Sequence, residues 1–199
     1  ARAQAMVAAG ADILDIGGES TRPGAAEVPV ADEIARTAPV IAAIRAAGIV
    51  TPVSIDTRKA GVAAAALRAG ADIVNDVSAL SWDADLARVT AEAGVPICLM
   101  HAQGTPQTMQ ADPRYGDVLA EVYEYLARRI DHAVAQGIAP GRIITDPGIG
   151  FGKTLPHNLT LLRGLARFHT LGAPILLGAS RKRFIGTISG VEAAAARMP

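Results

Sequence analysis

The chain has 199 residues, half of them hydrophobic, which is enough to bury one substantial core in a single domain. Its 19 basic and 19 acidic residues give a formal net charge of zero, which argues against the broad positive surface that nucleic-acid binding requires. The longest apolar stretches are short and broken by Gly, Asp or Pro, so neither a membrane span nor a signal peptide is predicted. We expect a cytoplasmic domain that binds neither nucleic acid nor a membrane.

Ala-rich helical segments alternate with short β-branched runs along the whole chain. Glycines such as Gly10, Gly48 and Gly70 follow the helical segments, where a left-handed residue is needed to end a helix. The alternation predicts a parallel α/β sheet. Helices are predicted at 1–9, 31–47, 58–69, 83–93, 116–136, 157–171 and 183–197, and strands at 13–16, 50–55, 73–75, 97–100, 142–145 and 175–177.

Polar residues near the ends of the predicted strands discriminate between two parallel architectures. Six strand ends that contribute to one cluster fit a ring better than the single crevice of an open sheet. We therefore predict a (β/α)8 TIM barrel with six of its eight βα units visible in one domain, residues 1–199, truncated at both ends. The polar residues concerned are Glu19, Asp56, Asn75, His101, Asp146 and the segment 180–182.

The glycine-rich segment 146–154 resembles a phosphate-binding loop. A Walker motif requires Gly where this chain has Pro147, and a dinucleotide-binding motif requires a third Gly where Lys153 stands. Nucleotide binding is therefore disfavoured. What remains is an acidic residue at a strand end, followed by a backbone flexible enough to approach a flat ligand.

Asp56, Asn75 and Asp146 occupy equivalent places after three of the predicted strands. Two carboxylates and an amide can pair with a ring edge that carries adjacent N–H, amino and carbonyl groups, and Lys182 can donate to a carbonyl or ring nitrogen. Asp also commonly caps turns, so a purely structural role for each carboxylate stays open. Because all three residues lie at strand ends, a binding site is favoured over separate structural roles.

Other residue types give weaker signals. Arg22, in a Gly/Pro-rich loop, could bring a cation to a departing phosphate, although from spacing alone a solvated charge is the better interpretation. Cys98 lies in an apolar run and is predicted to be a buried, unreactive thiol. No histidine pair has metal-ligand spacing, so a zinc site is not predicted; the histidines are His101, His132, His157 and His169.

Six motifs, taken together, resemble those of the dihydropteroate synthase family. They are DIGGESTRPG (15–24), SIDT (54–57), NDV (75–77), LMH (99–101), DPGIGFGK (146–153) and SRK (180–182). Some of them also occur in other pterin-binding barrels, such as methyltetrahydrofolate methyltransferases, but the STRP and SRK elements favour the synthase. Members of this family are transferases of folate biosynthesis, which condense 6-hydroxymethyl-7,8-dihydropterin pyrophosphate with p-aminobenzoate to give 7,8-dihydropteroate and pyrophosphate.

The resemblance implies roles for particular residues. Catalytic roles fall to Asp56, Asp146 and Lys182. The pterin would be held by Asp56, Asn75, Met100, Asp146 and Lys182. The sites for p-aminobenzoate and pyrophosphate would be formed by Thr21, Arg22, Pro23, Phe151 and Arg183, where Arg183 stands in place of a Ser found in many relatives.

The resemblance also implies Mg²⁺ as cofactor, sulfonamides as inhibitors and a homodimer. In the family, an Asn that helps to bind magnesium lies on a first strand, and an Arg and a His that hold pyrophosphate lie on a last strand. Neither segment is found in this sequence, so no metal ligand is expected within it. Two other hypotheses stay open, a pterin methyltransferase with a corrinoid-protein partner and a non-catalytic pterin-binding module.

Overall fold

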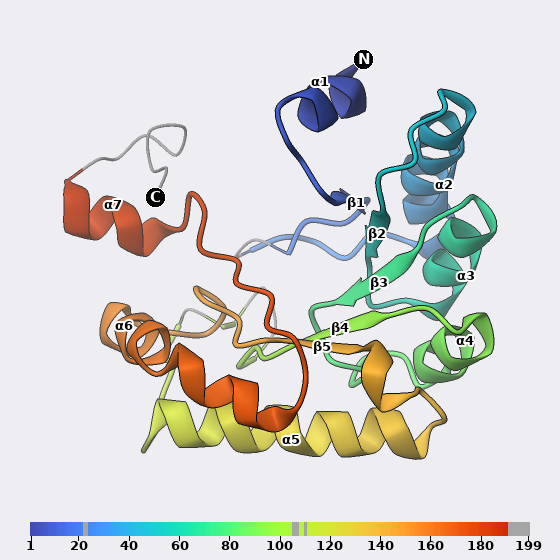
Figure 1. The fold of residues 1–199 in the computed structure, drawn as a ribbon. Coiled ribbons are helices and arrows are strands. Elements are labelled where there is room, and N and C mark those ends of the chain that lie inside the picture. The colour runs from blue at the N-terminus through green and yellow to red at the C-terminus, as the bar shows by residue number, and fades with distance from the viewer. Residues whose placement is uncertain (22–23, 105–107, 110, 191–199) are drawn as a thin grey trace.

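The computed structural model describes residues 1–21, 24–104, 108–109 and 111–190. This part of the chain contains one parallel sheet with strands in the order β1-β2-β3-β4-β5 (Figure 1). An open doubly wound sheet reverses its order at a switch point, whereas a barrel adds its strands in one direction. The parallel α/β class is confirmed, and the strand order is that of a (β/α)8 barrel. The strands are β1 (Leu14–Gly17), β2 (Val53–Asp56), β3 (Ile73–Asp76), β4 (Ile97–Met100) and β5 (Ile143–Asp146).

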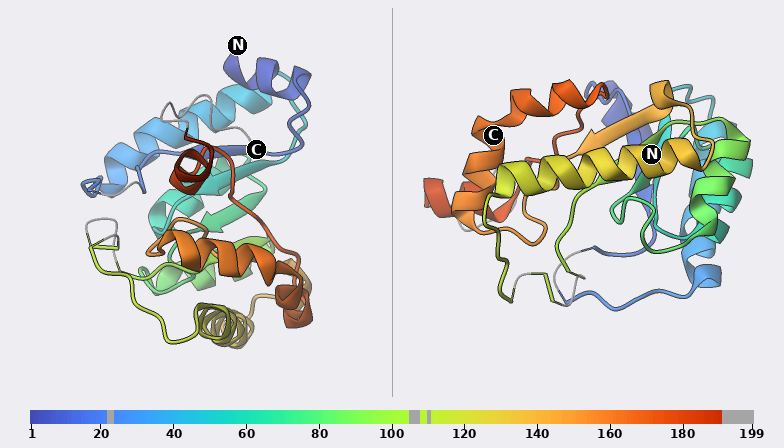
Figure 2. Two further views of the ribbon diagram at one scale, coloured as in Figure 1. Left: turned by 90° about the vertical axis from the view of Figure 1, so that its left-hand side faces the viewer. Right: turned by 90° about the horizontal axis from the view of Figure 1, so that it is seen from below.

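Helices surround the sheet on its outer side. In Figure 1, α2 (Val30–Ala46), α3 (Ala60–Arg68) and α4 (Asp85–Ala93) lie along one side of the strands, and α5 (Val118–Ala135) lies below β4 and β5. Figure 2 shows α6 (Leu155–Arg163) beside α5. The remaining elements are α1 (Arg2–Ala8), α7 (Arg183–Ser189) and the 3-10 helices η1 (Pro140–Arg142) and η2 (Leu165–Leu171). No helix among the described residues is long and apolar enough to cross a membrane.

The two faces of the sheet differ in polarity because successive strand residues point to opposite sides. One set belongs to the buried cluster beneath the helices, and burial of each such side chain contributes about 1.5–3 kcal/mol. This set is Leu14, Val53, Ile55, Val74, Ile97, Leu99 and Ile143. The residues of opposite parity form what we call the inner face: Asp15, Ser54, Asp56, Asn75, Cys98, Met100 and Asp146. The helices thus cover the apolar face and leave the polar one for a site.

A second buried cluster joins α5, α6 and η2. Val122 and Leu126 of α5 pack here with Leu161 of α6 and Phe168 of η2. Ile149 belongs to the same cluster and is only 1% exposed. This apolar contact holds the segment that follows β5 against the helical layer.

The C-terminal third differs from the sequence prediction in three places. The strand predicted at 175–177 forms a single bridge, between Ile175 and Thr145, because Pro174 and Gly178 limit the extended run. The helix predicted at 157–171 ends at Arg163 and continues as η2; Gly164 packs so closely on α5 that a Cβ there would lie 2.7 Å from Leu119. The helix predicted at 183–197 has α7 in its first part, which ends at Ser189 before Gly190 with a left-handed φ of +70°, and its positions 191–197 lie outside the described residues.

Candidate active site

Asp56 and Asn75 are paired in register at the carboxyl ends of β2 and β3. Asp15 on β1 lies next to them, because its carboxylate accepts hydrogen bonds from the Ser54 hydroxyl and, at 3.4 Å, from the side-chain amide of Asn75. Three neighbouring strands therefore place two carboxyl groups and an amide on the inner face. Asp15 was not predicted as a site residue, although a polar residue inside an apolar strand is a readable signal.

Burial, and after it the charges of Asp15 and Glu33, raise the pKa of the Asp56 carboxyl to about 8. Burial also raises the pKa of Asp15, against the hydrogen bonds from Ser54 and Asn75, which lower it. The two carboxyl groups thus lack sufficient compensating positive charge. A ligand that brings N–H donors or positive charge to this cluster would stabilise their ionised forms.

Asp146 ends β5 as the register partner of Met100. Its Oδ1 accepts a hydrogen bond from the Gly148 N–H at 2.7 Å, so the turn-capping role considered from the sequence is present. Burial raises the pKa of Asp146 and outweighs the lowering by this hydrogen bond and by the charges of Lys182 and Lys153, so that the pKa is about 6. A buried carboxyl whose pKa is shifted by burial and by the charge of Lys182 is suited to a ligand site as well as to a turn cap.

Lys182 contacts an aromatic ring and interacts electrostatically with Asp146. Its ammonium is 4.2 Å from the centre of the Phe151 ring, a distance typical of a cation–π contact. Burial lowers the pKa of Lys182, and the charge of Asp146 raises it. The structure therefore brings together three of the predicted site residues from segments far apart in the sequence.

Cys98 on β4 is close enough to Asp146, Asp15 and Asp56 for the charges of all three to act on its thiol. The thiol is buried, and its pKa is raised well above the ordinary value by burial and then by the charges of Asp146, Asp15, Asp76 and Asp56. The predicted burial of Cys98 is confirmed, and its raised pKa favours the thiol over the nucleophilic thiolate.

A cavity of about 200 Å³ opens beside the inner face. Its wall includes three predicted residues, Thr21, Met100 and Phe151. Arg183 is exposed at the first position of α7 and is absent from the residues that line this cavity, so its contact with a carboxylate stays a prediction. Arg22 and Pro23 lie outside the described residues. The other residues of the wall are Glu19, Arg58, Val77, Ser78, Ser81, Trp82, Ala102, Gly104, Met109 and Tyr125.

Lys153 organises the segment after β5 and was not predicted as a site residue. Its Nζ is 2.9 Å from the carbonyl oxygens of Gly148 and Phe151 and from Nδ1 of His101. Burial and the charge of Lys153 lower the pKa of His101 to about 3, so the imidazole is neutral at pH 7 and can accept this hydrogen bond. One buried amine thus fixes the backbone between Gly148 and Phe151. In the sequence, only the Gly-rich motif pointed to Lys153.

Magnesium requires oxygen ligands, usually carboxylates. Among the described residues, no group of three or more His, Cys, Asp or Glu side chains is arranged to hold a metal ion. The inner-face carboxyls do not by themselves form a magnesium site.

The whole chain, residues 1–199, matches the family of pterin binding enzymes. It is 49% identical to a dihydropteroate synthase of Synechocystis over 94% of this chain and 64% of that protein. It is also similar to the Xanthomonas albilineans dihydropteroate synthase solved with 4-aminobenzoic acid, at a TM-score of 0.92 and 44% identity over 98% of this chain and 69% of that one.

A third relative is the Yersinia pestis dihydropteroate synthase, solved as a complex with a sulfonamide drug. The TM-score is 0.91 and the identity 43%, over 95% of this chain and 68% of that chain. The chain spans slightly less than two thirds of the Synechocystis protein and slightly more than two thirds of the two solved relatives. On this evidence, the chain belongs to the dihydropteroate synthase family of pterin binding enzymes.

Proposed function

We propose that the protein containing this chain is a dihydropteroate synthase. The reaction joins 6-hydroxymethyl-7,8-dihydropterin pyrophosphate to p-aminobenzoate and yields 7,8-dihydropteroate and pyrophosphate. The observation that carries the proposal is the inner-face cluster, in which Asp56, Asn75 and Asp146 lie at or near strand ends and the charge of Lys182, the N-cap residue of α7, acts on Asp146. Family membership supplies the substrate class, and the cluster supplies groups that suit it.

The pterin would bind by its polar edge. Asp56 and Asn75 are register partners and can pair with adjacent N–H and carbonyl groups, while Asp146 and Lys182 serve the rest of the ring. Because the pKa of Asp56 is about 8 without ligand, its carboxyl is mainly protonated at pH 7. Ligand N–H groups favour the ionised carboxylate, so Asp56 would release its proton when the pterin binds. Met100, the register partner of Asp146, would pack near the ring.

The chemistry then requires stabilisation of charge. The bond between the pterin methylene carbon and the pyrophosphate oxygen breaks, and its electron pair leaves with pyrophosphate. Asp56 and Asp146 would stabilise the positive charge that develops on the pterin. The amine nitrogen of p-aminobenzoate forms the new bond to carbon and loses a proton. No covalent enzyme intermediate is needed, which suits a Cys98 thiol held in its protonated form.

The cavity next to the inner face would admit p-aminobenzoate between Thr21 and Phe151. The Xanthomonas relative was solved with 4-aminobenzoic acid and the Yersinia relative with a sulfonamide, and these structures support both ligand classes for this chain. Sulfonamides mimic p-aminobenzoate and should compete for the same pocket. Arg22, in the same segment of sequence as Thr21, would stabilise the leaving pyrophosphate.

Three further parts of the hypothesis stay predictions: Mg²⁺ as cofactor, a homodimer and a cytoplasmic location. Magnesium would add positive charge at the leaving pyrophosphate. Analytical ultracentrifugation tests the dimer, and activity after chelation and metal addition tests the cofactor.

The test is product formation by the protein as its gene encodes it. Incubation with both substrates should release pyrophosphate and produce dihydropteroate, detected by mass spectrometry, and omission of p-aminobenzoate should abolish both signals. Pterin binding without product would favour the non-catalytic module. Methyl transfer that depends on a corrinoid protein would favour the methyltransferase.

A further inference from the structure

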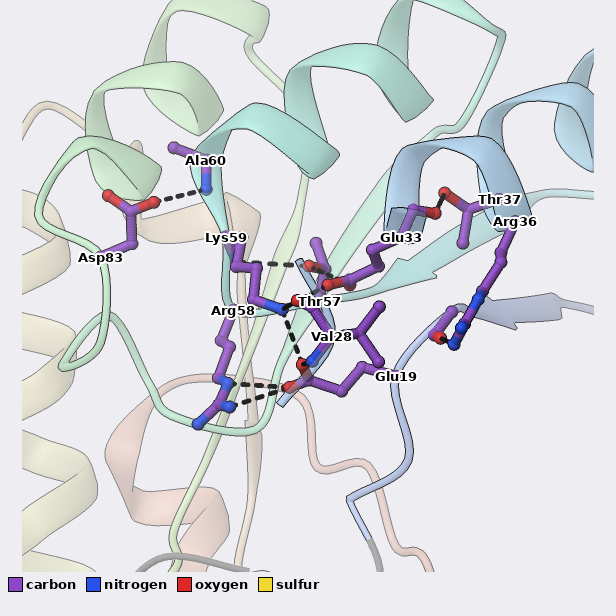
Figure 3. A network of polar contacts seen from close by, with 11 residues as sticks. Glu19, Val28, Glu33, Arg36, Thr37, Thr57, Arg58, Lys59, Ala60 and Asp83 are labelled. Atoms are coloured by element: carbon purple, nitrogen blue, oxygen red, sulfur yellow. Dashed lines mark hydrogen bonds and ion pairs between the residues drawn. The ribbon is translucent and has the colours of Figure 1, made fainter. Parts of the chain in front are cut away.

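One buried ammonium joins the two ends of the connection between β1 and α2 (Figure 3). Lys59 Nζ donates to the Glu19 carboxylate at 2.6 Å and to the Val28 carbonyl oxygen at 2.6 Å. The Val28 N–H in turn donates to the same Glu19 oxygen at 2.7 Å. Glu19 and Val28 are nine positions apart in the chain. The ammonium and one carboxylate therefore close the base of the segment 20–27.

The same ammonium connects this segment to α2. Lys59 Nζ donates to Glu33 at 2.7 Å, and the other oxygen of Glu33 accepts from the Thr57 hydroxyl at 2.7 Å. The side chains of Lys59 and Glu33 are only 4% and 1% exposed. Burial lowers the pKa of Lys59, but its hydrogen bonds to Glu19 and Glu33 and the charges of these carboxylates outweigh burial and raise the pKa overall, so the ammonium stays charged. Buried charges of this kind are tolerated only with such partners.

The second oxygen of Glu19 is also held. Arg58 donates to it from Nε at 3.1 Å and lies within 2.9 Å of it through its terminal nitrogen. The Arg58 guanidinium stacks on the Trp82 ring, 3.6 Å from its centre. Glu19, Arg58 and Trp82 all line the cavity that contains Thr21. Glu19 is therefore fixed at both carboxylate oxygens, two residues before Thr21.

We propose that Lys59 is a positioning residue for the second substrate. It fixes Glu19 and Val28 and thereby holds Thr21 at the wall of the cavity. The inference rests on the proposed function, because it takes this cavity to admit p-aminobenzoate. Lys59 touches no substrate and acts through Glu19. The residue lies three positions after Asp56, so one short segment serves both the pterin cluster and the second-substrate cavity.

Kinetics of Lys59→Met test the positioning role, because the substitution keeps the length of the side chain and removes its charge. The KM for p-aminobenzoate should rise about tenfold or more, while the Kd of the pterin pyrophosphate changes less than about twofold. Glu33→Gln is the matched control: it neutralises a carboxylate on the same ammonium and leaves the contacts between Lys59, Glu19 and Val28 in place. Its KM for p-aminobenzoate should stay within about twofold of wild type.

Lys59→Met alone leaves two buried carboxylates without their ammonium and could unfold the protein. The double variant Lys59→Met/Glu33→Gln removes one positive and one negative charge and should fold, as circular dichroism and thermal melting will show. It should retain the raised KM for p-aminobenzoate. A KM equal to that of Glu33→Gln would overturn the positioning role.

Amide hydrogen exchange gives a readout that does not need turnover. In the double variant, peptides from residues 19–29 should exchange about tenfold faster than in Glu33→Gln, while peptides from α5 should not change. Unchanged exchange of residues 19–29 would overturn the inference whether or not the protein makes dihydropteroate. Faster exchange with an unchanged KM would also overturn it. A wild-type protein that makes no dihydropteroate would instead contradict the proposed function. Hydrogen exchange would still show whether Lys59 fixes residues 19–29.

Discussion

The backbone of Gly148 lies directly against the carbonyl oxygen of His101: a Cβ on Gly148 would come within 1.8 Å of that oxygen. The glycine also has a left-handed φ of +68°. This contact joins the segment after β4 to the segment after β5. Since the Gly148 N–H donates to Asp146, the same contact fixes a carboxylate of the proposed site.

Gly148→Ala should therefore disrupt both stability and pterin binding. The added methyl meets backbone, which cannot move away as a flexible side chain would, so the free energy of unfolding should fall by about 3 kcal/mol or more. Gly141→Ala is the control, because a Cβ there meets nothing within 4 Å. Its free energy of unfolding should change by less than about 0.5 kcal/mol. Urea denaturation of both variants measures the difference, and equal stabilities would refute the close contact.

Asp56 should make stability depend on pH. Its pKa is raised from 3.8 to about 8 in the folded chain, so between these values the native state binds more protons than the unfolded state. The free energy of unfolding should therefore fall as pH rises through this window. Asp56→Asn cannot ionise and should be more stable than wild type at pH 8 by on the order of 5 kcal/mol, because each pKa unit corresponds to about 1.4 kcal/mol, with no such gain at pH 4.

The measurement for Asp56 is urea denaturation without ligand at several pH values between 4 and 8. Asp131→Asn, at an exposed position of α5, is the control and should follow the wild-type curve. Parallel curves for Asp56→Asn and wild type would show that Asp56 ionises in the folded protein as it does in the unfolded chain.

Asp146→Asn should weaken pterin binding and slow the reaction, because a carboxylate that would stabilise developing positive charge becomes a neutral amide. We expect kcat/KM to fall about 100-fold or more. The amide oxygen can still accept the Gly148 hydrogen bond, so the fold should persist. Wild-type turnover in a folded variant would leave Asp146 with only its turn-capping role.

Lys153→Met should destabilise the segment after β5. The substitution leaves the carbonyl oxygens of Gly148 and Phe151 without their shared donor in a buried place. The expected loss is about 2–4 kcal/mol. Arg163→Met removes an exposed cation at the end of α6 and should cost less than about 1 kcal/mol. A loss for Lys153→Met as small as that of Arg163→Met would contradict the organising role.

Three residues of the inner face can be predicted from the sequence because their positions follow from local rules, whereas Asp15 and Ser54 are not found in this way. Asp56, Asn75 and Asp146 each come at the end of a short β-branched run, and parallel strands bring such ends together. The partners of Lys59 could not be found in this way, since they lie 26 to 40 positions away along the chain. The run 175–177 has strand composition, but pairing depends on neighbours that composition does not specify, and only Ile175 forms a bridge.

The alternation of strand residues has an evolutionary consequence. On β2, Val53 and Ile55 anchor the fold, while Ser54 and Asp56 between them face the ligand side. Selection on the proposed ligand site and selection on stability would therefore act on interleaved codons of the same four-residue strand. A substitution at Ser54 would therefore change the inner face and leave the apolar side of the same strand as it is.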